Sequence, residues 1–184
     1  MKSFISTLLA SVVISAPTVA APLPADHKQF LNTMASDGVQ VYINKPAEVC
    51  FDDSGNSNST SGMYFVFESD RLRNLIVCQD NRKTSEVVAW TDNDLDTIRH
   101  EGFHIIQDCM AGANNDMVFG MVFTNHDEVI DALGVEESMR IMLDYSYLYN
   151  IDMHGDIKYE IEAFYASRDY SAAELNSMYT QYCL

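Results

Sequence analysis

The sequence is poor in basic side chains. Its 184 residues hold 11 Lys and Arg against 27 Asp and Glu, which gives a formal net charge of −16. Proteins that bind nucleic acid or an anionic membrane surface neutralise phosphates with clustered Lys and Arg, and scattered cations do not supply such a cluster. Nucleic acid and anionic lipid are therefore excluded as the main partner.

Internal repeats are also lacking, and no apolar run is long enough to cross a bilayer comfortably. The run at residues 4–14 follows Lys2 and precedes Thr18-Val19-Ala20 and Val19-Ala20-Ala21, two small-x-small sites of the kind that signal peptidase accepts. We expect residues 1–21 to be a signal peptide, with a short N-terminal membrane anchor as the alternative. Residues 22–184 would then form a single secreted or periplasmic domain without stable membrane insertion.

The composition, with 47% hydrophobic and 11% aromatic residues, is that of a globular domain. In the N-terminal half the pattern predicts a helix, a strand, a flexible loop and a two-stranded hairpin, over 22–36, 39–43, 52–62 and 63–78. From residue 91 the apolar period becomes helical and predicts helices over 92–110, 127–133, 135–149, 156–168 and from Ser171 onward. The expected class is α+β: a small antiparallel sheet or hairpin packed on a central helix, followed by a helical C-terminal half.

Four cysteines in an exported chain predict two disulfides. Three pairings are possible. We favour Cys50–Cys78 and Cys109–Cys183, because each pair closes a separate region and the second would pin the last turn of the chain to the central helix. The alternative is a set of free buried thiols.

The segment His100-Glu101-Gly102-Phe103-His104 is an HExxH motif inside the longest expected helix. Two histidines at positions i and i+4 share one helix face and can bind zinc, and the glutamate can act as a general base. On a helical wheel an apolar stripe faces the core, and both histidines lie on the opposite face with Glu101 at its margin. The motif predicts a zinc site that opens into a cleft. A pair of solvated surface histidines is the alternative.

A catalytic zinc needs a third protein ligand. The extended pattern with a third histidine is excluded, because Gln107 and Met110 stand where that pattern needs Gly and His. The helix over 156–168 offers two glutamates instead.

Of these, Glu160 lies on the apolar face of the expected helix, whereas Glu162 shares a face with Lys158 and is expected to point to solvent. An ionised carboxylate on an apolar face is costly unless a cation compensates it. We therefore expect Glu160 to be the third ligand. The alternative is an ion pair of Glu160 with Arg99, Arg140 or Arg168.

With the HExxH motif and Glu160-x-x-Ala163, the sequence resembles the gluzincin branch of the zincin metallopeptidases. The resemblance implies a zincin-like fold and one catalytic zinc held by His100, His104 and Glu160. It also implies peptide-bond hydrolysis with Glu101 as general base, on a peptide or protein substrate held along an edge strand of the sheet.

The resemblance leaves two roles open. Many gluzincins carry an acid four residues after the ligand glutamate to support a ligand histidine, but Phe164 stands at that position, and Asp94, Asp108 or Asp156 could substitute. The group that stabilises the oxyanion is one of a set of aromatic residues: His126, His154, Tyr149, Tyr165 and Tyr170.

The leading hypothesis is a small, secreted, monomeric zinc peptidase. One alternative is a non-catalytic zinc-binding or interaction module that keeps the fold. The intact Glu101 argues against this alternative, because a site that no longer catalyses a reaction needs no base. Phe164, which stands at the position of the missing acid, argues for it. The other alternative is a structural exported protein, stapled by its disulfides, in which HExxH is coincidental.

Overall fold

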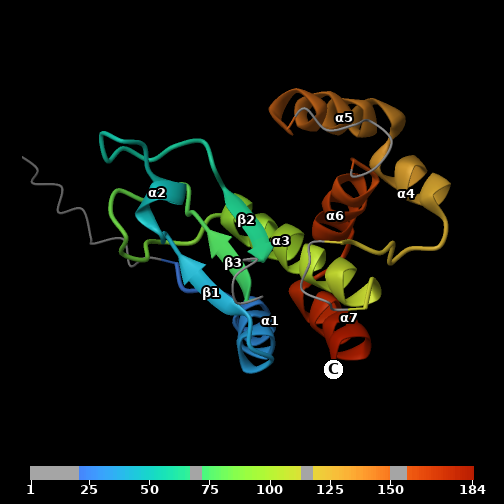
Figure 1. Ribbon diagram of the computed structural model, residues 1–184, viewed down its shortest axis with the longest axis horizontal. Coiled ribbons are helices and arrows are strands. Elements are labelled where there is room, and N and C mark those ends of the chain that lie inside the picture. Colours follow the sequence, from blue (N-terminus) through green and yellow to red (C-terminus); the bar gives the residue numbers. More distant parts are fainter. Residues whose placement is uncertain (1–20, 67–71, 113–117, 150–156) are drawn as a thin grey trace, which may run out of the picture.

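A computed structural model describes residues 21–66, 72–112, 118–149 and 157–184, without the side chains of 146–149 (Figure 1). All but the last residue of the expected signal peptide lie outside these ranges. The described residues form seven helices and three strands: α1 Ala25–Ser36, β1 Gln40–Ile43, α2 Ala47–Cys50, β2 Gly62–Val66, β3 Arg73–Val77, α3 Asp92–Met110, α4 His126–Leu133, α5 Val135–Tyr149, α6 Ile157–Asp169 and α7 Ala172–Cys183. The α+β class is confirmed.

The sheet is mixed rather than antiparallel. Its strand order is β1-β3-β2, with β2 antiparallel to β3, as the hairpin predicted, and β1 parallel to β3. A parallel pair needs a long crossover, which the chain supplies through α2, the loop after it and β2. β3 is therefore central, with Leu75, Ile76 and Val77 fully buried, and β2 is an edge strand beside α3.

Helix α3 lies at the centre of the molecule, between the sheet and the two helices α6 and α7 (Figure 1). Its apolar stripe is buried as expected. Phe30 of α1 approaches so closely that a Cβ on Gly102 would lie 2.6 Å from its ring, which explains the glycine inside the motif. The polar face is buried as well, because α6 covers it, so the side chains on that face must find partners inside the protein.

Both ends of α3 are fixed. At its start, Thr91 and Asp94 form a capping box, in which each side chain accepts a hydrogen bond from the other residue's backbone N–H. At its end, the expected Cys109–Cys183 disulfide ties the helix to the last turn of α7. The other expected pair, Cys50–Cys78, is also present and joins α2 to the end of β3.

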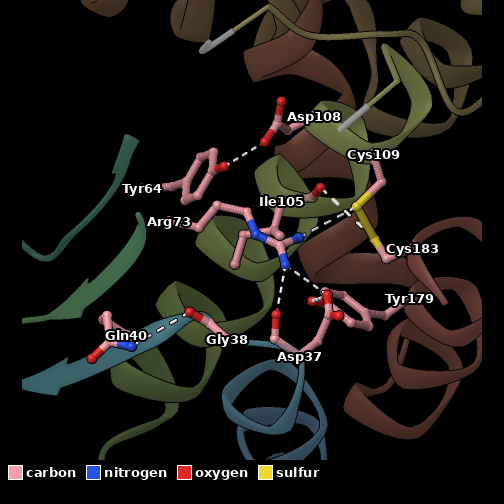
Figure 2. A network of polar contacts seen from close by, with 10 residues as sticks. All are labelled: Asp37, Gly38, Gln40, Tyr64, Arg73, Ile105, Asp108, Cys109, Tyr179 and Cys183. Atoms are coloured by element: carbon pink, nitrogen blue, oxygen red, sulfur yellow. Dashed lines mark hydrogen bonds and ion pairs between the residues drawn. A yellow bond between two sulfur atoms is a disulfide. The ribbon is translucent and has the colours of Figure 1, made fainter. Parts of the chain in front are cut away.

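A polar network surrounds the second disulfide. Figure 2 shows the Arg73 guanidinium between Cys109 and Asp37, whose carboxylate it contacts at 2.6 Å. The Tyr179 hydroxyl donates to the same carboxylate, at 2.8 Å. These contacts join α1, β3, α3 and α7 at the end of α3, one turn beyond the motif. None of the helices in the described ranges is long and apolar enough to cross a membrane.

Candidate metal centre

The two histidines of the motif lie one helical turn apart on α3 and turn their Nε2 atoms toward each other, 3.2 Å apart. Both are almost fully buried, at 6% and 5% exposure. The alternative of two solvated surface histidines is therefore wrong. Burial of this kind is expected for imidazoles that have a common partner rather than water.

Glu160 reaches the histidines from α6. Its Oε2 atom lies 3.3 Å from His100 Nε2 and 3.5 Å from His104 Nε2. The predicted juxtaposition of these three side chains is present. The alternative ion pair is not: Arg99 binds the Ser167 carbonyl and Asp96, and Arg140 and Arg168 both pair with Glu137.

The three atoms form a nearly equilateral triangle of the size that zinc requires. Two ligands about 2.0–2.1 Å from a tetrahedral ion lie roughly 3.3–3.4 Å apart, and the observed edges are 3.2, 3.3 and 3.5 Å. Within the described residues, Glu160 Oε2 is also a buried oxygen that receives no hydrogen bond of acceptable geometry. Two imidazoles and one carboxylate are a common donor set of catalytic zinc, so these residues fit the ion.

The electrostatics of the metal-free cluster agree with this geometry. Burial opposes ionisation of Glu160, but the facing imidazoles outweigh it and hold the pKa of its carboxyl well below the usual range. Burial likewise lowers the pKa of His104, yet the Glu160 carboxylate more than compensates and raises it to about 9. His104 is therefore protonated at neutral pH and pairs with the Glu160 carboxylate.

Glu101 lies beside the triangle, half-buried between α3 and the edge strand β2. Burial raises the pKa of its carboxyl, against the opposing effect of the two histidines, and the backbone of Tyr64 hydrogen-bonds to it. The strand can come this close only because residue 62 is glycine. A Cβ there would lie 2.8 Å from Glu101 Cγ and 2.5 Å from Thr97 Cγ2.

A pocket of about 350 Å³ opens at His100 and Glu101. One wall is the chain before and at the start of β2, and another is the first turns of α3. Two aromatic rings from α5 and α6 form the remaining wall. The residues lining it besides His100 and Glu101 are Ser59, Thr60, Ser61, Gly62, Met63, Asn93, Asp96, Thr97, Tyr145 and Phe164.

The loop that supplies the first wall was expected to be flexible, but its second half is anchored. The buried Arg82 guanidinium donates to the carbonyls of Asn58 and Thr60 and also to the carbonyls of Cys50 and Cys78. Each of these hydrogen bonds satisfies a backbone carbonyl and is strengthened by the positive charge of the guanidinium. The wall of the pocket is thereby fixed to the disulfide-linked end of the sheet.

The acid expected to support a ligand histidine is replaced by an amide. Gln107 Oε1 lies 2.7 Å from His104 Nδ1. Asp94 caps α3 instead and Asp108 accepts from the Tyr64 hydroxyl, so neither takes this role, and Asp156 lies outside the described residues. The sequence feature that could have identified Gln107 is its position on the same face of the α3 helical wheel as the two histidines.

The expectation that Glu162 points to solvent is wrong: the side chain is fully buried. Its carboxylate accepts from the Gln107 amide and from the backbone N–H groups of Val122 and Phe123, all from chain segments outside α6. A helical wheel of α6 alone could not reveal these donors. Burial raises the pKa of the Glu162 carboxyl although these hydrogen bonds oppose the rise.

Phe164, at the position of the missing acid, packs its ring edge-on against His100, with 4.5 Å between ring centroids. Tyr145 contacts Phe164 in the same edge-on manner.

Tyr145 is thus a phenol in the wall of the pocket that sequence reasoning missed. Its position depends on how α5 packs on α6, for which the spacing of tyrosines in α5 gave no signal. The named oxyanion candidates with described side chains do not line this pocket: Tyr165 and Tyr170 pack around Phe123, and His126 lies at the start of α4. The side chain of Tyr149 and all of His154 lie outside the described structure.

Comparisons of the chain with protein-family models, with curated proteins and with solved structures find no match.

Proposed function

We propose that this protein is a small zinc-dependent peptidase. The observation that carries the proposal is the triangle of His100, His104 and Glu160, whose edges have the lengths that a tetrahedral zinc requires, with a carboxylate beside it at the mouth of a pocket. The donor set and its burial support zinc over the oxygen-loving cations Mg²⁺ and Ca²⁺, because two of the three donors are imidazole nitrogens.

In this proposal His100, His104 and Glu160 hold the ion. Zinc bound there would lower the pKa of a water molecule and polarise a substrate carbonyl. Glu101 accepts the proton of the attacking water and passes it to the leaving amine, because its carboxylate lies at the margin of the triangle and burial raises the pKa of that carboxyl above its usual range. The Tyr145 phenol, in the pocket wall, is the donor that we assign to the developing oxyanion.

The substrate would be an extended peptide. β2 is an edge strand, and its first residues, Gly62 and Met63, line the pocket beside Glu101. An edge strand offers unpaired backbone groups to which a peptide can add as a further strand. The net charge of −16 would favour cationic substrates by steering. Two disulfides fit an extracytoplasmic site of action, secreted or periplasmic.

The test combines metal analysis with an activity assay on the purified chain. Wild-type protein should contain one equivalent of zinc and hydrolyse casein in a chelator-sensitive manner. Glu101→Gln should keep the zinc and lose at least about 100-fold in rate, because an acceptor for the water proton is removed while the ligands stay. No zinc in the wild-type protein would refute the proposal.

The same assays separate the alternative in which the protein binds zinc without catalysis. The edge-on packing of Phe164 against His100, where the resemblance leads one to expect an acid, is the observation that favours it. Tight zinc binding with no hydrolysis by the wild-type protein would support that alternative.

A further inference from the structure

The amide of Gln107 is held in one orientation. Its Nε2 atom donates to two acceptors, the Tyr159 carbonyl at 3.0 Å and Glu162 Oε2 at 2.8 Å. A flipped amide would place its oxygen against both of these oxygens, so the flipped form is disfavoured. Oε1 must therefore be the atom that lies 2.7 Å from His104 Nδ1.

This orientation decides which nitrogen of His104 carries the proton. A carbonyl oxygen can only accept, so the neutral ring must bear its hydrogen on Nδ1 and keep the lone pair of Nε2 free. Nε2 is the atom that points into the triangle with His100 and Glu160. Gln107 thus selects the tautomer that can bind a metal.

Glu162 is what orients the amide. Its carboxylate is fully buried and accepts from Gln107 as well as from the N–H groups of Val122 and Phe123, at 3.0 and 2.7 Å. A buried carboxylate is costly, and its three donors offset that cost. A neutral glutamine at 162 could turn a donor toward the Gln107 amide, whereas a carboxylate can only accept.

The same carboxylate holds a segment over the ligand. Residues 119–123 pass beside His104, and the Phe119 ring stacks on the imidazole with 5.3 Å between centroids. The Gly120 N–H donates to the Gln107 carbonyl at 2.8 Å, and a Cβ on Gly120 would meet the α3 backbone at 2.9 Å. The segment is therefore pinned to α3 and α6 by its backbone.

We infer that Gln107 is the positioning residue of His104 and that Glu162 fixes the orientation of the Gln107 amide. Zinc affinity then depends on the two side chains, Gln107 and Glu162, as a pair. The inference rests on the proposed zinc site. In this inference the neutral amide of Gln107 orients the imidazole of His104, and the buried carboxylate of Glu162 orients that amide. Removal of a group that orients a metal ligand typically weakens metal affinity by about 10–100-fold.

The experiment measures zinc affinity by competition with a chromophoric chelator, and the absorption spectrum of the Co²⁺-substituted protein. Gln107→Met should weaken zinc binding about 10–100-fold and alter the Co²⁺ spectrum. The matched control is Gln79→Met. Gln79 is also a fully buried glutamine, but it bonds to Asn44 and Val88, so its loss should lower the melting temperature while zinc affinity and the spectrum stay at wild-type values.

An exchange of the two side chains separates positioning from mere packing. Gln107→Glu places two carboxylates against each other, and Glu162→Gln removes the fixed acceptor, so each single variant should bind zinc at least about 10-fold more weakly. In the double variant the carboxylate at 107 can accept from both His104 and the amide at 162. It should recover part of the lost affinity, because one oxygen of the carboxylate at 107 still faces the Tyr159 carbonyl.

The outcomes are distinct. Wild-type protein that binds no zinc would overturn the proposed function and this inference with it. Wild-type protein that binds zinc tightly, with a folded Gln107→Met variant of unchanged affinity and spectrum, would overturn the inference alone. If the double variant shows the sum of the losses in zinc binding free energy of Gln107→Glu and Glu162→Gln, the inference that the two side chains act as a pair would be overturned.

Discussion

Substitution of Gly62 by alanine should disturb Glu101, the proposed catalytic base, without disturbing the three proposed metal ligands. The added methyl group would lie 2.5 Å from Thr97 Cγ2 and 2.8 Å from Glu101 Cγ, well inside van der Waals contact. Neither neighbour is a metal ligand in our proposal. Relief of the overlap must move β2 or the Glu101 side chain, by roughly 1 Å if carbon contacts are to return to about 3.5–4.0 Å.

Two effects of known size follow. Overpacking of this kind costs about 1–3 kcal/mol in the free energy of unfolding. A catalytic group misplaced by about 1 Å can cost about 100-fold in rate. Gly62→Ala should therefore keep its zinc, unfold at lower urea concentration and hydrolyse casein about 100-fold more slowly than the wild-type protein.

Thr97→Ser supplies the matched control and a partial rescue. It deletes the Cγ2 atom that is closest to the new methyl group and keeps the hydroxyl that donates to the Asn93 carbonyl. The double variant should regain much of the stability but little of the turnover, because the contact with Glu101 remains. A Gly62→Ala protein with wild-type stability and wild-type rate would refute the reasoning.

Three further predictions concern the same site. Glu160→Gln should lower zinc affinity by orders of magnitude, measured by chelator competition, because it removes one of three ligands, and unchanged affinity would refute the ligand assignment. In the metal-free protein the pKa of His104 is raised from 6.5 to about 9, so its contribution to stability is complete below pH 6.5 and is lost as the pH rises through 9. Urea unfolding of chelator-treated protein should show a loss of roughly 3 kcal/mol over that range, and Glu160→Gln should flatten it. Tyr145→Phe should lower the rate about 100-fold with zinc content unchanged, if the phenol donates to the oxyanion, and a wild-type rate would remove that assignment.

The parts of the fold that local patterns determine were predictable. The capping residues Thr91 and Asp94 and the helical period place α3, and the HExxH spacing places both histidines on one face of it. The apolar neighbours of Glu160 in α6 predicted that it faces the histidines, although its side chain is only partly buried, and the position of the cysteines predicted both disulfides.

What escaped prediction depends on backbone groups from distant segments. Glu162 is buried because the N–H groups of Val122 and Phe123 meet it, and a helical wheel contains no information on such donors. The parallel pairing of β1 with β3 likewise follows from the path of the crossover rather than from the alternation within either strand.

The fixation of α3 at both ends bears on how the protein would acquire its metal. The Cys109–Cys183 bridge closes a loop with a sequence separation of 74, which by the chain-entropy model stabilises the folded state by about 4.5 kcal/mol. Unlike a zinc finger, whose folding depends on the ion, such a domain can hold its ligand triangle together before any zinc arrives. If the protein is an exported zinc peptidase, as we propose, metal uptake would then carry no folding cost and could follow export, so that an inactive, folded apoprotein would be loaded at its destination by whatever zinc is present there.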